Sequence, residues 1–326
     1  MWFKSIQPYR FDKTFEHTAE SLADCLNKNL FTPCSAYAMS SMGWFPPMGN
    51  DEAPMVHAVG HTMMVALKVQ DKILPASVVN EQLDERCRAL QAQDGVAPKG
   101  RQKQRLKEEI YNALLPKALT KSTVIHGIID TKSNWLWVNA SSPNKAEMFL
   151  SSLREVLGSL PVVKPEVSSP GAVMTSWLRR SYVPENLLIE DACVMIDPSV
   201  EGGTIRCRRQ DLQSKNIQSF LRDGCEINQM ALTWREQVSF VLCHDFTFKQ
   251  LRFLDAVREV VDDIQAETPE QQFDADFVIM TETLQEMMNA MLAFFVEGNE
   301  TLSGADVGSV SEVVSEERAA QEVECV

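Results

Sequence analysis

The sequence predicts an α+β protein in which helices pack on mixed or antiparallel sheets. Of its 326 residues, 44% are hydrophobic and 23% are charged, which is the balance of a water-soluble globular protein. Segments that alternate apolar and polar side chains come in adjacent pairs joined by tight turns, as in antiparallel hairpins. Segments with a helical apolar period lie between these pairs. At roughly 100–200 residues per domain, the chain is long enough for two or three compact units.

The first part of the chain combines a strand, a helix, ordered turns and a hairpin. Residues 2–11 alternate weakly, which predicts a strand, and residues 19–29 carry an apolar stripe that predicts a helix. Proline and glycine beside aromatic residues predict ordered turns at 31–34 and 42–49. Two short apolar runs within 55–69 predict a β-hairpin.

The next segment predicts two helices that form a protruding hairpin over residues 77–121. Ser77 is the expected N-cap of the first helix, and Gly95 gives its stop signal. The second helix begins near Arg101 and carries an apolar stripe until Pro116 interrupts it. Part of the basic side chains in this helix lie off the stripe, so we expect them to face solvent or a partner.

A second hairpin and a further helix follow. Residues 122–130 and 135–139 alternate on either side of a short polar turn, which predicts paired strands. Ser142 as a cap and Pro143 as the first helical residue predict the start of a helix, and Gly158 predicts its end.

The second half repeats this mixture. Periodicity predicts helices near 172–180, 253–263 and 276–295, and strands near 192–196, 203–209, 226–233 and 237–243. A short helix that ends near Gly224 has Asp211 or Ser214 as its cap. From Gly298 onward the sequence is acidic and poor in large apolar side chains, which predicts a mobile tail.

These elements predict four parts of the chain. They are an N-terminal α/β subdomain (1–76 and 122–165), the helical hairpin as a protruding tip (77–121), a C-terminal α/β subdomain (166–297) and the acidic mobile tail (298–326). The boundary between the two subdomains rests on the proline- and serine-rich stretch before Gly171, which is typical of a passage between subdomains.

The formal charge of −14 is distributed unevenly. Residues 251–326 carry a net charge of −15, so the preceding 250 residues carry +1. Positions 99–121 have a surplus of five positive charges, and positions 206–215 have a surplus of three. Because physiological salt screens charges beyond about 8 Å, a polyanion responds to such local clusters. The net charge therefore does not exclude nucleic-acid binding, although runs of Lys and Arg are also typical of solvated surfaces.

Export, membrane insertion and cofactor binding find no support in the sequence. The apolar runs are far shorter than the roughly 20 residues of a bilayer span, and the first residues lack the apolar run of a signal peptide. The eight cysteines are scattered without a Cys-x-x-Cys pair, which fits a reducing compartment. We therefore expect a cytoplasmic protein with no membrane segment, metal site or cofactor.

Sequence signatures of catalysis are also missing. The five histidines are dispersed, and Gly-x-Ser-x-Gly does not occur. Asp274 and Asp276 could supply oxygen ligands to a divalent ion, which leaves a metal-dependent nuclease open. The competing interpretation is that both carboxylates cap a helix. We expect a protein that is not an enzyme.

A series of short motifs follows the order found in one known family. The motifs are Trp2-Phe3-Lys4, Phe31-Thr32-Pro33-Cys34, Met42-Gly43-Trp44, Pro46-Pro47-Met48-Gly49, Lys72-Ile73-Leu74-Pro75, Leu114-Leu115-Pro116, Gly158-Ser159-Leu160-Pro161-Val162-Val163, Arg209-Gln210-Asp211-Leu212 and Phe273-Asp274-Ala275-Asp276-Phe277. On these residues the sequence resembles the RdgC family of recombination-associated DNA-binding proteins. Only the tail after about Glu297 falls outside the resemblance.

The resemblance implies crescent-shaped subunits whose ends pair into a ring-forming dimer around duplex DNA. It also implies sequence-independent binding of double-stranded DNA, which restrains the RecA recombinase, and hence a location at the nucleoid. Lys117 matches a family position that is basic, and Arg209 with Gln210 matches a family motif, so all three are implied DNA contacts. Leu119 stands where a family relative has phenylalanine at the interface that closes the ring.

The two basic clusters and the motifs together give the candidate DNA-binding residues. These are Lys99, Arg101, Lys103, Arg105, Lys117, Arg206, Arg208, Arg209 and Gln210. Arg206 and Arg208 share one face of a predicted strand, because side chains alternate along a strand. Two alternatives stay open. One is the metal-dependent nuclease with Asp274 and Asp276, and the other is a protein-interaction scaffold whose basic clusters are only solvated surface.

Overall fold

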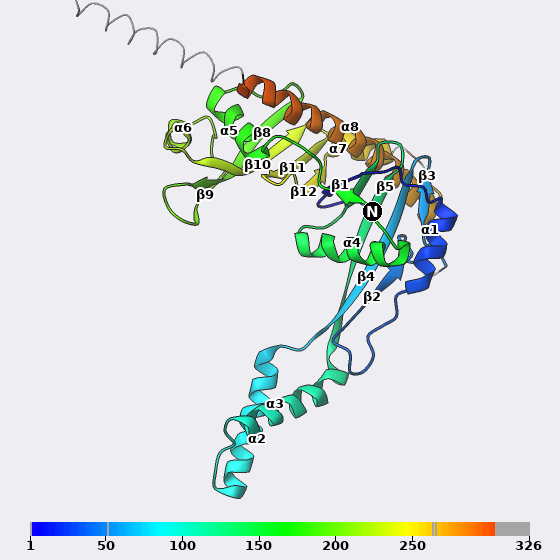
Figure 1. Cartoon of the computed structure of the whole chain (residues 1–326), viewed down its shortest axis with the longest axis vertical. Coiled ribbons are helices and arrows are strands. Elements are labelled where there is room, and N and C mark those ends of the chain that lie inside the picture. Colours follow the sequence, from blue (N-terminus) through cyan, green and yellow to red (C-terminus); the bar gives the residue numbers. More distant parts are fainter. Residues whose placement is uncertain (1, 51, 263, 265, 304–326) are drawn as a thin grey trace, which may run out of the picture. The chain divides into compact units, whose positions relative to one another are not determined.

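The computed structural model describes residues 2–50, 52–262, 264 and 266–303, and it confirms an α+β protein with antiparallel sheets (Figure 1). The chain divides into two compact units. Unit 1 contains residues 1–12, 135–143 and 162 onward, and unit 2 contains residues 13–134 and 144–161. The predicted division into four parts stays a prediction.

Unit 2 is built around one long strand. β4 (Thr62–Ile73) pairs antiparallel with β2 (Ser40–Phe45), β3 (His57–Val59) and β5 (Leu119–Asp130). The helices of the unit outside the hairpin are α1 (Ala19–Leu26), the 3-10 turn η1 (Asn27–Asn29) and α4 (Pro143–Leu157). The ring of Phe149 packs edge-on against Trp44 with 5.4 Å between centroids. Gly127 makes room for Phe149, because a Cβ there would lie 2.3 Å from the ring.

The predicted helical hairpin forms within unit 2. It consists of α2 (Ala76–Asp94) and α3 (Arg101–Leu114), followed by the 3-10 turn η2 (Leu115–Lys117). The hairpin extends from the adjoining ends of β4 and β5 (Figure 1). Gly95 ends α2 with a left-handed φ of 75°, as the sequence indicates, but the N-cap is Pro75 and not Ser77. No residue of α3 is buried, so its apolar stripe stays partly exposed.

Unit 1 contains a five-stranded antiparallel sheet in the order β12-β11-β10-β8-β9. The strands are β8 (Leu187–Asp197), β9 (Gly203–Arg208), β10 (Glu226–Trp234), β11 (Val238–Cys243) and β12 (Phe248–Phe253). The helices of this unit are α5 (Pro170–Arg180), α6 (Lys215–Arg222), α7 (Asp255–Asp262) and α8 (Pro269–Ser303). A second group of strands pairs β1 (Gln7–Phe11) with β6 (Trp135–Val138) and β7 (Val162–Val163).

Helices α5 and α8 cover one face of the five-stranded sheet. The Thr175 hydroxyl on α5 accepts a hydrogen bond from the backbone N–H of Ile227 on β10 at 2.8 Å. Trp177 on α5 and Phe246 beside β11 each lie 5.4 Å from the ring of Phe295 on α8. The core of unit 1 therefore lies between this face and the two helices, and the opposite face carries the candidate site.

Three sequence predictions are wrong in part. Met42–Phe45 belongs to β2 and not to a turn, because Gly43 lets the strand approach Phe31, whose Cα would lie 2.5 Å from a Cβ at that position. Strand β12 was not predicted, and the helix expected from residue 253 begins at Asp255. The last helix begins at Pro269, where the Thr268 hydroxyl accepts a hydrogen bond from the N–H of Gln271.

Helix α8 includes the first residues of the predicted tail, and the mobility of the tail stays a prediction. Helix α8 extends to Ser303, so residues 298–303 are helical. The rest of the predicted tail, 304–326, lies outside the described residues.

The stability of the protein is expected to depend on pH through His126. This side chain on β5 is 8% exposed, and its burial lowers its pKa from 6.5 to about 4. The unfolded chain therefore takes up the proton first as the pH falls, and the folded state loses stability below pH 6.5. One unit of pKa shift corresponds to about 1.4 kcal/mol, so we expect the free energy of unfolding to fall by about 2 kcal/mol between pH 7 and pH 5. Urea unfolding at the two pH values measures this change. His126→Gln should remove this part of the loss, and an identical pH dependence in both proteins would contradict the assignment.

Candidate nucleic-acid interface

The open face of the five-stranded sheet carries paired arginines on its edge strand. Arg206 and Arg208 on β9 are both exposed, as the period of two predicts, and Cys207 between them is buried. Cys207 lies directly opposite Cys193 on β8, under the arginine face. Two effects raise the pKa of the Cys193 thiol to about 12: burial is the larger, and the neighbouring Cys207 is the smaller. This thiol therefore stays protonated and behaves as part of the core.

A hollow of about 650 Å³ lies on this open face, and we call it the sheet groove. Its lining residues come from all five strands and the turn after β9. They are Asp191, Ala192, Cys193, Val194, Arg206, Cys207, Arg208, Arg209, Gln229, Val241, Gln250 and Arg252. Four of these side chains are guanidinium groups, and Asp191 is the one carboxylate in the lining. None of the four arginines forms an ion pair with another residue in the described part of the chain. The groove is therefore a positively charged surface open to an anion.

The motif Arg209–Leu212 turns the chain away from β9. Arg209 has a left-handed φ of 53°, and the N–H of Gln210 donates to the carbonyl oxygen of Asp191 at 3.1 Å. An Asp211 carboxylate oxygen accepts from the N–H of Gln213 at 2.9 Å, and Leu212 is buried. Asp211 and Leu212 thus hold the turn in place, and Arg209 and Gln210 remain exposed for a ligand.

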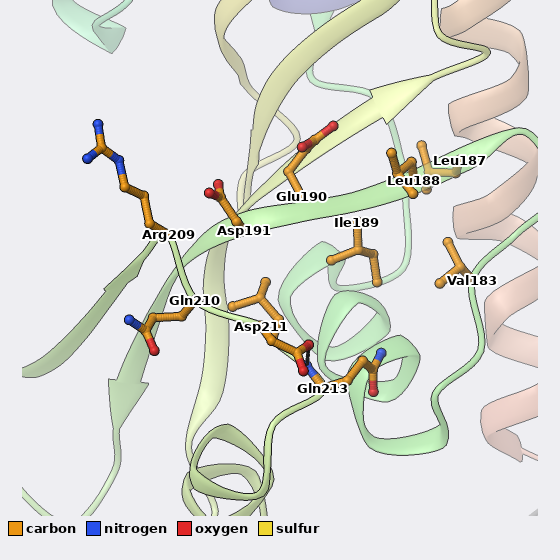
Figure 2. A pocket seen from close by; sticks show the side chains of 11 residues that line it. Val183, Leu187, Leu188, Ile189, Glu190, Asp191, Arg209, Gln210, Asp211 and Gln213 are labelled. Carbon is orange, nitrogen blue, oxygen red and sulfur yellow. Dashed lines mark hydrogen bonds between the residues drawn. The ribbon is translucent and has the colours of Figure 1, made fainter.

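A second cavity, of about 610 Å³, also borders this turn and shares Asp191 and Arg209 with the sheet groove. Figure 2 shows the Arg209 side chain directed away from the apolar lining residues Val183, Leu187 and Ile189. Three carboxylates, Glu190, Asp191 and Asp211, also line this cavity. Their charge disfavours a phosphate there, so the sheet groove is the better anion site of the two.

The basic residues of the helical hairpin are exposed, but unlike the arginines of the sheet groove they include one that lies near a carboxylate. Lys99 lies in the loop before α3, and Arg101, Lys103 and Arg105 follow on α3. The Lys103 ammonium lies 3.8 Å from a carboxylate oxygen of Asp84 on α2. The charge surplus of residues 99–121 therefore overstates the local field, because it leaves out the acidic side chains of α2.

Lys117 and Leu119 stand at the base of the hairpin, next to a buried lysine. Lys72 on β4 is 9% exposed, and its ammonium donates to the carbonyl oxygens of Ala36 and of Leu115, the latter at 3.0 Å. These bonds hold η2, which carries Lys117. Leu119 is 77% exposed and lies opposite Ile73 on β4, which is 47% exposed. The base of the hairpin thus combines a cation with an uncovered apolar pair.

Replacing Lys72 by methionine is expected to destabilise unit 2. Methionine keeps the apolar stem but leaves the carbonyl oxygen of Leu115 without this donor, at a cost of about 1–3 kcal/mol. Chemical denaturation should show this loss. Lys121→Met, at an exposed position of β5, is the matched control and should change stability little. Equal stability of the two variants would show that the Lys72 bonds are dispensable.

The structure brings part of the predicted site together and adds to it. Arg206, Arg208 and Arg209 share the sheet groove, while the hairpin residues and Lys117 belong to the other unit. Sequence reasoning missed Arg252, Gln229 and Gln250. Arg252 lies on β12, whose alternation is interrupted by a register shift against β11, so the signal for this strand was weak.

Asp274 and Asp276 lie inside α8 and not at its start. Residues two apart on a helix do not face each other, so the pair is poorly placed to share one ion. The side-chain amide of Gln272 donates to Asp276 at 3.2 Å. Thr268 caps the helix, so the capping interpretation of the two carboxylates is wrong. Among the described residues, no group of three or more His, Cys, Asp or Glu side chains is arranged to hold a metal ion.

Comparison with known proteins decides the family. Residues 1–298 match the family model described as "Putative exonuclease, RdgC". The chain belongs to the RdgC family. It is 36% identical over 296 residues to the recombination-associated protein RdgC of Psychromonas ingrahamii, an alignment that covers 90% of this chain and 98% of that protein. It is 38% identical to the proteins of the same name from Tolumonas auensis and Pasteurella multocida, with 90% of this chain and 97% of each relative covered.

The RdgC match includes every motif on which the resemblance was based, from Trp2-Phe3-Lys4 to Phe273–Phe277. The sheet groove and the helical hairpin both lie within the matched residues. Within the described residues, no helix is both long and apolar enough to span a bilayer.

Proposed function

We propose that this RdgC-family chain is a non-enzymatic protein that binds double-stranded DNA without sequence preference. Two crescent-shaped copies form a ring-shaped homodimer that encircles the duplex at the nucleoid. The bound ring restrains RecA-dependent homologous recombination. The observation that carries this proposal is the cluster of exposed arginines in the sheet groove, on the face of the sheet in unit 1 opposite to α5 and α8.

The chemistry of the groove supports a phosphate backbone as the ligand. Guanidinium groups pair with phosphate oxygens in a bidentate geometry, and such contacts carry no sequence information. Arg206 and Arg208 sit two residues apart on the exposed face of one strand, which lets both contact the same polyanion. Lys117 and the hairpin residues would supply further phosphate contacts.

The exposed apolar side chains of unit 2 support the dimer. Leu119 and Ile73 form an uncovered pair, and Leu106 and Ile110 on α3 are only half-buried. A second copy related by two-fold symmetry would cover such surfaces. The same symmetry would place each basic cluster twice around the enclosed duplex, so that the DNA meets positive charge from both copies.

The link to recombination comes from the relatives, which are named recombination-associated proteins. A protein that occupies duplex DNA competes with a recombinase that must engage the same duplex. Restraint of RecA therefore follows from DNA occupancy and needs no catalytic step.

Duplex affinity measured over a salt series tests the proposal. Fluorescent duplexes of unrelated sequence should bind with similar dissociation constants. The logarithm of the association constant should fall linearly with the logarithm of the salt concentration, at about 0.9 per neutralised phosphate. A flat salt dependence would show that the arginines make no phosphate contacts and would favour the protein-interaction scaffold.

The word exonuclease in the family description makes the nuclease alternative worth a direct test. Duplex and single-stranded DNA are incubated with the protein and Mg²⁺ or Mn²⁺. We expect intact strands. Strand cleavage that disappears in the double variant Asp274→Asn and Asp276→Asn would overturn the non-enzymatic assignment.

A further inference from the structure

A third cavity in unit 1 lies where the N-terminal segment runs along β12. We call it the Trp2 cavity; its volume is about 400 Å³, and Trp2, Phe3, Lys4, Gln250, Leu251, Arg252, Phe253 and Arg258 line it. The N–H of Leu251 donates to the carbonyl oxygen of Lys4 at 2.9 Å, which holds the segment beside the strand. Phe3 is 1% exposed and anchors the segment in the core. The Trp2 cavity is therefore built on fixed backbone.

The side chains of this cavity combine aromatic and positive groups. The indole of Trp2 is half-buried and packs against Phe253 with 4.6 Å between ring centroids. Lys4, Arg252 and Arg258 are exposed, and no carboxylate of the described residues lines the cavity. None of the three cations forms an ion pair with another residue that the structure describes. An aromatic ring beside unpaired cations suits a ligand that has both a flat ring and a phosphate.

The Trp2 cavity is continuous with the sheet groove. Gln250 and Arg252 line both hollows. Gln250 has a left-handed φ of 53°, and the pairing of β12 with β11 shifts register between Ser239 and Val241. A register shift of this kind, as in a β-bulge, changes the direction in which the neighbouring side chains point. Arg252 thus connects a broad groove without aromatic lining to a small cavity with an aromatic wall.

We propose that the Trp2 cavity binds an unpaired nucleotide of a DNA strand whose duplex part lies in the sheet groove. The base lies against the indole of Trp2, and its phosphates contact Arg252 and Arg258. A base inside continuous duplex cannot reach the indole because it is stacked between its neighbours, so the cavity distinguishes a junction between duplex and single strand from continuous duplex. This inference rests on the proposed DNA binding, and it adds a preference for duplexes with a single-stranded overhang over blunt duplexes.

Two DNAs test the inference, a blunt duplex and the same duplex with a short single-stranded overhang. The wild-type protein should bind the overhang DNA more tightly. Trp2→Ala should weaken binding of the overhang DNA about tenfold, since stacking on one aromatic residue is worth that much, and should leave the blunt duplex unchanged. Trp2→Phe, which keeps an aromatic face, should retain most of the preference. Thermal unfolding of each variant shows whether the packing against Phe253 survives.

Two further measurements keep the result decisive if Trp2→Ala does not fold. A 2-aminopurine at the first unpaired position should be quenched by the wild-type protein. Arg258→Gln removes a cation and leaves the aromatic pair of Trp2 and Phe253 intact. For overhang DNA, it should reduce the slope of the logarithm of the association constant against the logarithm of the salt concentration by the amount expected for about one phosphate contact. Equal affinity of the wild-type protein for both DNAs, or an unquenched 2-aminopurine, would overturn the inference. Salt-independent binding of both DNAs would instead reject the proposed DNA-binding function.

Discussion

Replacing both Arg206 and Arg208 by glutamate is expected to reduce duplex affinity about 100-fold at moderate salt. Two phosphate contacts are lost, and two carboxylates then face the polyanion. The plot of the logarithm of the association constant against the logarithm of the salt concentration should become less steep, by about two in slope. Both side chains are exposed, so the variant should unfold at the same denaturant concentration as the wild-type protein. Fluorescence anisotropy over a salt series measures both quantities.

A charge-matched control separates local contacts from net charge. Arg180→Glu with Arg222→Glu changes the formal charge by the same amount, and both residues are exposed on helices of the same unit, α5 and α6. Neither lines the sheet groove. This control should retain most of the affinity. If the two double variants lose affinity equally, the groove does not contact the DNA, and the net charge of the protein alone determines the affinity.

Replacing Leu119 by glutamate is expected to convert the proposed dimer into an open or monomeric form. Leu119 and Ile73 leave apolar surface at the base of the hairpin, and a partner copy that covers it would have to bury the new carboxylate. An unpaired buried charge costs several kcal/mol, which exceeds what one contact in an interface contributes. Sedimentation of the variant should show a lower mass at micromolar concentration.

Two variants define the origin of that effect. Leu119→Phe enlarges the apolar side chain and should preserve or strengthen the dimer. Thr120→Glu adds the same charge at the next position of β5, on the opposite face of the strand, and should leave the mass unchanged. An unchanged mass for Leu119→Glu would remove this residue from the interface.

Much of the fold could be predicted because local signals agreed with tertiary structure. Helix α4 begins at Pro143 and ends before Gly158, as cap and stop residues indicate. The hairpin of β3 and β4 forms where the two short apolar runs predict it. Gly43 misled the prediction because glycine indicates a turn locally, whereas here it permits the close approach of Phe31. That reason lies in a distant segment and cannot be read from the neighbouring residues.

The candidate site could be predicted only where residues are adjacent in sequence. Arg206 and Arg208 follow from the period of two along one strand, and both lie on the open face. Arg252 joins them through sheet pairing across β8, β10 and β11, which no local pattern encodes. Asp84 near Lys103 was missed for the same reason, because the contact depends on the packing of two helices.

The central claim is that basic side chains from separate stretches of the chain face one DNA duplex. A structure of the protein bound to a duplex of about 30 base pairs measures this directly. The account predicts a two-fold dimer around the duplex, with Lys117, Arg206 and Arg209 of both copies against the phosphates. A complex in which these three side chains point away from the DNA would contradict it.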